Sequence, residues 1–149
     1  MTEKTFLLVE DDNDDCELFT EAIEAVDASV RFYFATDGKE ALDKLSGNAI
    51  QSPDIIFLDI NMPQMNGWQL LNRLKEDQTL KDIPVIMYST SSQMNDMKKA
   101  SASGALCFFT KPNSFLHLKK MLEVVVSHMR QNRLDGLCDA VHKLKWSAS

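Results

Sequence analysis

The strongest constraint on the fold is a regular alternation: five short apolar runs are each followed by a longer segment with apolar residues at helical spacing. The first run, TFLLV at residues 5–9, has the composition of a buried strand, and residues 14–26 then carry apolar side chains every three or four positions. The later runs predict strands at residues 30–35, 54–58, 84–88 and 105–109. The later periodic segments predict helices at residues 68–77, 93–103 and 114–130, and a shorter one that opens at Asp37-Gly38 and carries Ala41, Leu42 and Leu45.

Strands that alternate with helices in this way predict a parallel sheet with helices on both faces, because each crossover lays a helix over the sheet. We therefore expect a doubly wound α/β domain. In such sheets the functional site lies beyond the carboxyl ends of the strands, where the direction of winding reverses. The residues that follow each strand are thus the candidate functional residues.

Charge and cysteine content narrow the function classes. The 149 residues include 16 basic and 22 acidic ones without any basic run, so direct nucleic-acid binding is not expected. No apolar stretch approaches the roughly 18 residues that span a bilayer, and the first residues lack the layout of a signal peptide. The spacing of Cys16, Cys107 and Cys138 fits neither a disulfide framework nor a zinc site. A cytoplasmic protein in a reducing compartment, with no membrane contact, is predicted.

Polar side chains stand directly after four of the predicted strands. Glu10 and Asp11 follow the first strand, Asp59 the third, Ser89 the fourth and Lys111 the fifth. Acids that share one rim repel each other, and a divalent cation with oxygen ligands, most simply Mg²⁺, relieves that repulsion. A lysine and a hydroxyl on the same rim suit a phosphoryl group, which predicts phosphoryl transfer with Asp59 as the nucleophile.

These residues carry a family resemblance. VEDD ends the first strand, LDINMPQMNG surrounds Asp59, MYST ends the fourth strand and FFTKP ends the fifth. With these four blocks, the chain resembles the receiver domain of two-component response regulators, most closely the single-domain type of the chemotaxis regulator, over about residues 4–131. The resemblance implies a flavodoxin-like fold with strand order 2-1-3-4-5, a receiver domain at residues 1–131 and a C-terminal extension at residues 132–149 without an output domain.

The resemblance also implies roles for individual residues. Asp59 would be the phospho-acceptor, and Asp11, Asp59 and the main-chain carbonyl of Asn61 would bind Mg²⁺ directly, with Glu10 as the outer acid. Lys111 would pair with the phosphate, and its peptide bond to Pro112 would be cis. Ser89 would be the switch hydroxyl, and Phe108 would be the switch aromatic. Asn61 and Ser91 lie at the positions that set the lifetime of the phosphate.

The predicted activity is that of a switch, not of an enzyme acting on external substrates. A sensor histidine kinase or a phosphotransfer protein would supply the phosphoryl group, and contact with an unidentified downstream protein would be the output. Two alternatives stay open: a Mg²⁺-dependent phosphatase with an aspartyl-phosphate intermediate, and a receiver that acts as a scaffold without phosphorylation. Asn61 weighs against the phosphatase, because an amide cannot serve as the acid that protonates a leaving group. A dinucleotide site is not expected, because EDDNDD follows the first strand in place of a glycine-rich turn.

The C-terminal extension contains a second periodic pattern. Leu134, Leu137, Val141 and Leu144 recur at steps of three and four and predict a short helix, which Gly136 weakens. A helix packed on its own domain, or a frayed end, is favoured over a dimer contact, so a monomer or weak dimer is expected.

Overall fold

The computed structural model describes residues 3–47, 49–90 and 93–144 of the chain. Five parallel strands form one sheet in the order β2-β1-β3-β4-β5, which confirms the predicted doubly wound fold. The strands are β1 (Thr5–Val9), β2 (Arg31–Ala35), β3 (Ile55–Leu58), β4 (Val85–Ser89) and β5 (Cys107–Thr110). The helices are α1 (Asn13–Val26), α2 (Gly38–Ser46), α3 (Gly67–Glu76), α4 (Met94–Ala102), α5 (Phe115–Arg130) and α6 (Leu137–His142), with a short 3₁₀ helix, η1 (Leu134–Gly136), before α6.

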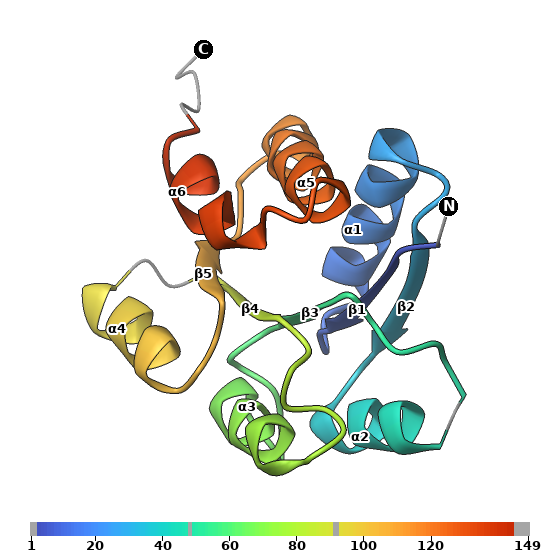
Figure 1. The fold of residues 1–149 in the computed structure, drawn as a ribbon, viewed down its shortest axis with the longest axis vertical. Coiled ribbons are helices and arrows are strands. Elements are labelled where there is room, and N and C mark those ends of the chain that lie inside the picture. The colour runs from blue at the N-terminus through green and yellow to red at the C-terminus, as the bar shows by residue number, and fades with distance from the viewer. Residues whose placement is uncertain (1–2, 48, 91–92, 145–149) are drawn as a thin grey trace.

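The helices enclose the sheet in two layers (Figure 1). Helices α1 and α5 lie over one face, α2 and α3 lie over the other, and α4 lies beside β5. Both β1 and β3 are buried along their whole length, because a parallel sheet covered on both faces has no solvent-facing side. Aromatic rings fill the α1/α5 face, where the rings of Phe19 and Phe57 lie 5.0 Å apart and Tyr88 packs edge-on against both.

Helix starts follow the capping chemistry of the sequence. The side chain of Asp12 accepts hydrogen bonds from the backbone N–H groups of Asp14 and Asp15 and so begins α1. Asn66 begins α3 through a capping box with Gln69. Both caps lie at the carboxyl end of the sheet, so they fix where the loops after β1 and β3 enter their helices.

The described part of the C-terminal extension, residues 132–144, packs on its own domain. Leu137 is fully buried and Val141 is 7% exposed, and both belong to the core cluster under α1 and α5. Leu134 and Leu144 pack against the same cluster. In Figure 1 helix α6 lies beside β5 and α5. The apolar stripe seen in the sequence is therefore an intramolecular contact surface here.

Two sequence-based expectations are wrong. Cys107 and Cys138 form a disulfide with their Cα atoms 5.5 Å apart, and Cys16 is the free, buried cysteine. The spacing of 31 residues carries no recognisable signature, because the two thiols meet only when α6 folds back onto β5.

The bond between Lys111 and Pro112 is trans, since the described residues contain no cis peptide. A trans bond before proline is the lower-energy form, and the local sequence does not override that preference.

No helix in the described ranges combines the length and apolar character needed to cross a bilayer.

Candidate functional site

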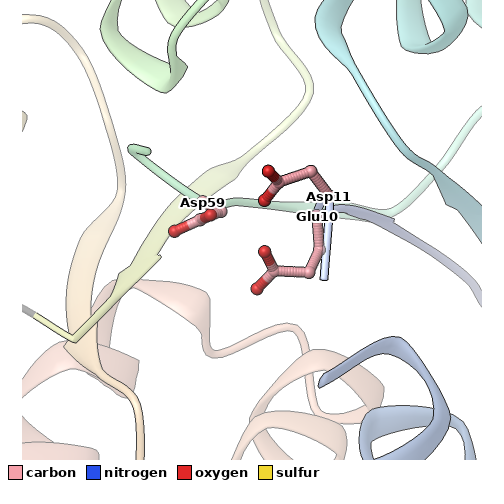
Figure 2. A group of neighbouring side chains, drawn as sticks. All are labelled: Glu10, Asp11 and Asp59. Carbon is pink, nitrogen blue, oxygen red and sulfur yellow. The ribbon is translucent and has the colours of Figure 1, made fainter. Parts of the chain in front are cut away.

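Three carboxylates gather at the carboxyl ends of β1 and β3 (Figure 2). Val9 pairs with Leu58 in the register of these neighbouring strands, so the residues that follow both strands reach the same edge of the sheet. The backbone N–H of Asp59 donates to the carbonyl of Val9 at 3.0 Å and holds the two ends together. One carboxylate oxygen from each of Glu10, Asp11 and Asp59 lies within 4.8 Å of the other two. The acids that the sequence placed on one rim therefore do meet.

Burial makes this cluster electrostatically costly. Glu10 is 1% exposed and Asp59 is 5% exposed, whereas Asp11 faces solvent. Burial, followed by the hydrogen bond and negative charge of Asp59, raises the pKa of Glu10 to about 8. Two buried carboxylates side by side need compensating positive charge to remain ionised at neutral pH.

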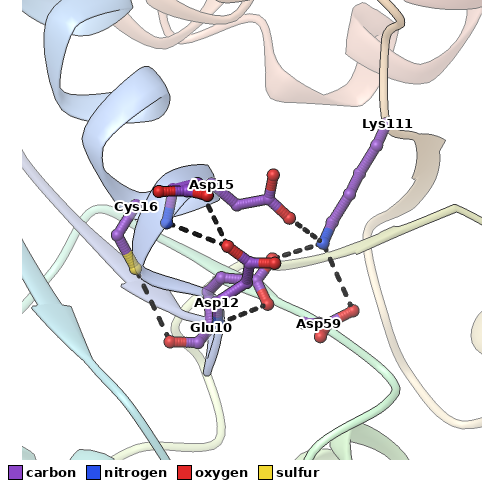
Figure 3. A network of polar contacts seen from close by, with 7 residues as sticks. Glu10, Asp12, Asp15, Cys16, Asp59 and Lys111 are labelled. Atoms are coloured by element: carbon purple, nitrogen blue, oxygen red, sulfur yellow. Dashed lines mark hydrogen bonds and ion pairs between the residues drawn. The ribbon is translucent and has the colours of Figure 1, made fainter.

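Lys111 supplies positive charge from β5's side of the site (Figure 3). Its Nζ donates a hydrogen bond to Glu10, lies 2.9 Å from Oδ2 of Asp15 and lies 3.7 Å from Oδ1 of Asp59. Burial alone would lower the pKa of Lys111, but its bonds to Glu10 and Asp15 outweigh this effect and raise the pKa above the usual lysine value. The lysine therefore carries a full charge at neutral pH and bridges acids from β1, α1 and β3.

Asp15 is the member of this network that sequence reasoning missed. It lies in the first turn of α1, where an acid is ordinarily interpreted as favourable to the helix dipole. The contact with Lys111 depends on how β5 ends, and a local pattern does not contain that information.

Three of the remaining predicted site residues lie in or after the neighbouring strands β3, β4 and β5. Ser89 is fully buried at the end of β4, and its carbonyl accepts a hydrogen bond of 2.7 Å from the backbone N–H of Lys111. Phe108 is 4% exposed and packs in the cluster on the α2/α3 face. Asn61 is exposed, two residues beyond Asp59 in the loop after β3. Ser91 lies outside the described residues.

The loop after β3 is held tightly against the start of α3. The backbone N–H of Gly67 donates to the carbonyl of Ile60 at 2.9 Å. A Cβ atom at Gly67 would clash with the carbonyl oxygen of Asp59 and would lie 2.9 Å from the Cα of Ile60. Glycine at this position therefore lets α3 begin directly behind Asp59, because only a residue without a side chain permits that approach.

The donor set fits a hard divalent cation. All three clustered side chains present carboxylate oxygens, and the described site contributes no sulfur or imidazole ligand. Oxygen-only sets of this kind suit Mg²⁺, Ca²⁺ and Mn²⁺ better than zinc or copper. Burial and the neighbouring Asp59 raise the pKa of Glu10 even beside Lys111, and a cation in the cluster would offset that electrostatic cost.

Comparison with known families agrees with this geometry. The model of the response regulator receiver domain matches residues 6–123. The chain belongs to this family. As a receiver domain it is a component of two-component signalling, and its family binds a divalent metal at the acidic pocket.

Two relatives are similar to this receiver over most of their own length. It is 33% identical over 134 residues to the probable methanogenesis regulatory protein FilR2 of Methanothrix harundinacea, covering 87% of this chain and 86% of that protein. It is 36% identical over 92 residues to the chemotaxis protein CheY1 of Helicobacter pylori, covering 62% of this chain and 73% of that protein.

Solved structures show the same fold. The phosphorylated cyanobacterial phytochrome response regulator RcpA is 30% identical and superposes with a TM-score of 0.79, covering 88% of this chain and 96% of that one. The Mn²⁺-bound form of the response regulator Rcp1 is 29% identical with a TM-score of 0.73, covering 83% of this chain and 92% of that one.

Proposed function

We propose that this receiver domain is a cytoplasmic switch that accepts a phosphoryl group on Asp59 from a histidine kinase or a phosphotransfer protein. Asp11, Asp59 and the main-chain carbonyl of Asn61 would hold Mg²⁺, with Glu10 as the outer acid. The observation that carries this proposal is the meeting of Glu10, Asp11 and Asp59 within 4.8 Å at the rim, with the ammonium group of Lys111 3.7 Å from Asp59.

The chemistry follows from charge and position. An oxygen of the Asp59 carboxylate attacks phosphorus, and the bond between phosphorus and the donor nitrogen or oxygen breaks. The electron pair of that bond leaves with the donor. A carboxylate is a weak nucleophile, so most of the acceleration has to come from positioning and from cancelling charge on the phosphoryl oxygens.

Side chains of the protein supply part of the positive charge that would offset the phosphoryl oxygens. The ammonium group of Lys111 already contacts Asp59 and Glu10, and Asp15 anchors it from the side of α1. A bound Mg²⁺ would neutralise further negative charge at the same place. Ser89, buried at the end of β4, is the proposed hydroxyl partner of the transferred group.

The proposed output is phosphorylation-dependent contact with a downstream protein by a monomer or weak dimer. Ser89 ends β4, and Phe108 lies on the neighbouring strand β5, where Met87 pairs with Phe108 in the register. We propose that a movement of Ser89 toward a phosphoryl group is passed to β5, because Ser89 pairs with Thr110 of that strand in the register. The surface formed by α4, β5 and α5 is the proposed output face.

The test is incubation of the protein with acetyl phosphate and Mg²⁺, followed by intact mass measurement. We expect one phosphoryl group to be added per chain, with the adduct absent when EDTA removes the metal. Steady turnover of small phosphate esters would favour the phosphatase alternative. A chain that binds partners equally well with and without acetyl phosphate, and never gains the adduct, would be a scaffold.

Metal binding should stabilise the fold measurably. At a Mg²⁺ concentration one hundred times its dissociation constant, the free energy of unfolding is expected to rise by about 2.7 kcal/mol, because only the folded chain brings the carboxylates together. Urea denaturation with Mg²⁺ and with EDTA measures this difference. Asp11→Asn should remove most of the gain by deleting a ligand that lies at the rim and faces solvent.

Asp12→Asn is the matched control for this experiment. Asp12 is adjacent to Asp11 in the chain but caps α1, and asparagine caps helices as well as aspartate does. The control should keep the full stabilisation by Mg²⁺. An equal loss in both variants would show that general negative charge, and not a defined site, attracts the cation.

A further inference from the structure

The disulfide between Cys107 and Cys138 joins the C-terminal extension to the functional half of the sheet. Cys107 is the first residue of β5, and Cys138 is the second residue of α6. Strand β5 is an edge strand of the five-stranded sheet, and α6 lies against it (Figure 1). Phe108 directly follows Cys107, and Lys111 comes three residues later. The cross-link therefore fixes the strand that leads to the phosphoryl-transfer site.

Helix α6 depends on tertiary contacts for its order. It has six residues and no side-chain N-cap, and a helix this short is not stable by itself in water. Its anchors are the buried side chains of Leu137 and Val141, a contact of 3.2 Å between Nε2 of His142 and the carbonyl of Phe108, and the disulfide. The disulfide is the only covalent one of these anchors, so breaking it leaves the apolar contacts of this segment and weak polar contacts.

The two cysteines differ in exposure. Cys107 is 5% exposed, whereas Cys138 is half-buried. Thiol–disulfide exchange begins with attack on a reachable sulfur, so Cys138 is the entry point and Cys107 the leaving group. Sγ of Cys138 lies 2.8 Å from the carbonyl oxygen of Leu106. The disulfide has no proton to donate there, but the reduced thiol can donate a hydrogen bond to that carbonyl. In the reduced protein, the carbonyl oxygen of Leu106 is therefore already placed to accept a hydrogen bond from the Cys138 thiol.

We propose that Cys107 and Cys138 are a reversible redox modification site that controls how firmly α6 covers the β5 edge. Two molecules of a reduced thiol of the glutathione class convert the disulfide to two cysteine thiols, and the glutathione becomes one oxidised disulfide. Attack at Cys138 forms a mixed disulfide and releases Cys107 as a thiolate that takes a proton. A second glutathione then frees Cys138. Oxidation runs the same exchange in reverse, with two protein thiols giving up their protons and two electrons to oxidised glutathione.

The cytoplasmic setting, which is part of the proposed function, favours a reversible redox site over a permanent structural disulfide. Cytosolic disulfides are usually transient and catalytic or redox-sensing, because glutathione and thioredoxin keep most thiols reduced. Cys16 offers an internal reference. It is 4% exposed, so this cysteine should stay unreactive in the folded protein.

The test equilibrates the full chain in a series of reduced to oxidised glutathione ratios and measures free thiols by alkylation and intact mass. We expect the folded protein to change from an oxidised state in which no thiol is labelled to a reduced state in which Cys138 is labelled first and Cys107 is labelled as α6 opens, while Cys16 stays unlabelled. Hydrogen exchange on the same samples should be about tenfold faster in residues 134–144 after reduction, because opening of α6 is no longer covalently restrained.

Cysteine variants test whether the change in exchange comes from loss of the disulfide or from loss of any one cysteine. Cys107→Ser together with Cys138→Ser should show fast exchange in α6 at every glutathione ratio, and Cys16→Ser should behave like the original chain. If the double variant fails to fold, reduced wild-type protein provides the same comparison. Reduction only after denaturation, unchanged exchange in α6, or three unpaired cysteines at every ratio would each overturn the proposal. Labelling by acetyl phosphate, measured in parallel, reports on the phosphoryl site independently of these outcomes.

Discussion

Asp59→Asn is expected to abolish the acetyl phosphate adduct completely. The amide has nearly the same shape as the carboxylate but lacks the anionic oxygen that attacks phosphorus. The substitution also removes one of the three carboxylates that meet within 4.8 Å, so Mg²⁺ should bind less tightly as well. Intact mass after incubation with acetyl phosphate and Mg²⁺ measures the first effect, and denaturation with and without Mg²⁺ measures the second.

The fold should tolerate this change, which keeps the interpretation clear. The charge of Asp59 raises the pKa of its neighbour Glu10, so its removal relieves repulsion between two buried acids. Its ion pair with Lys111 is long, at 3.7 Å, and Lys111 keeps Glu10 and Asp15 as partners. We expect the free energy of unfolding without metal to stay unchanged or to rise by about 1 kcal/mol.

The matched control is again Asp12→Asn, an identical chemical change at the same rim. It should retain one phosphoryl group per chain, because Asp12 serves the N-terminus of α1. A full-sized adduct on Asp59→Asn would place the acceptor on another residue and end the assignment. Loss of the adduct in both variants would point to a general electrostatic requirement instead of a nucleophile.

The features that the sequence predicted correctly are those set by local pattern and by the geometry of parallel sheets. Apolar runs located all five strands within two residues. The clearest runs are β1, β3 and β4, which are buried along their whole length, and a strand buried on both faces has to be largely apolar. The rule that parallel strands share one carboxyl edge then brought Glu10 and Asp59 together without any knowledge of distances. Their meeting in the structure is a consequence of topology, and topology is what the alternation of elements encodes.

The features that the sequence did not reveal depend on where distant segments come to rest. Cys107 and Cys138 are 31 residues apart and pair only because η1 turns the chain back and α6 packs on β5. The contact of Asp15 with Lys111 likewise joins residues 96 apart. Such pairings depend on packing angles and on side-chain reach, and neither periodicity nor spacing contains that information.

Gly67→Ala should destabilise the fold by about 1–2 kcal/mol and should disturb the phosphoryl site together with it. The new Cβ would meet the carbonyl oxygen of Asp59 and the Cα of Ile60. These are main-chain atoms of the loop after β3, so they cannot rotate away as a flexible side chain does. Overpacking against such atoms typically costs 1 to about 3 kcal/mol. Alanine's better helix propensity returns only about 1 kcal/mol, so the steric cost wins.

Relief of this clash requires α3 to shift away from β3 or the Asp59 peptide to move. Either response alters the carboxylate that sits 3.7 Å from Lys111, so acetyl phosphate labelling should slow by more than the loss of folded protein explains. Urea denaturation and labelling rates under fully native conditions measure the two effects separately.

Gly136→Ala is the control, because its φ is −95° and the nearest atom to its added Cβ, Cδ2 of His128, is 3.9 Å away. That variant should be neutral or gain up to about 1 kcal/mol. Equal behaviour of the two alanines would show that the close approach at Gly67 does not position Asp59.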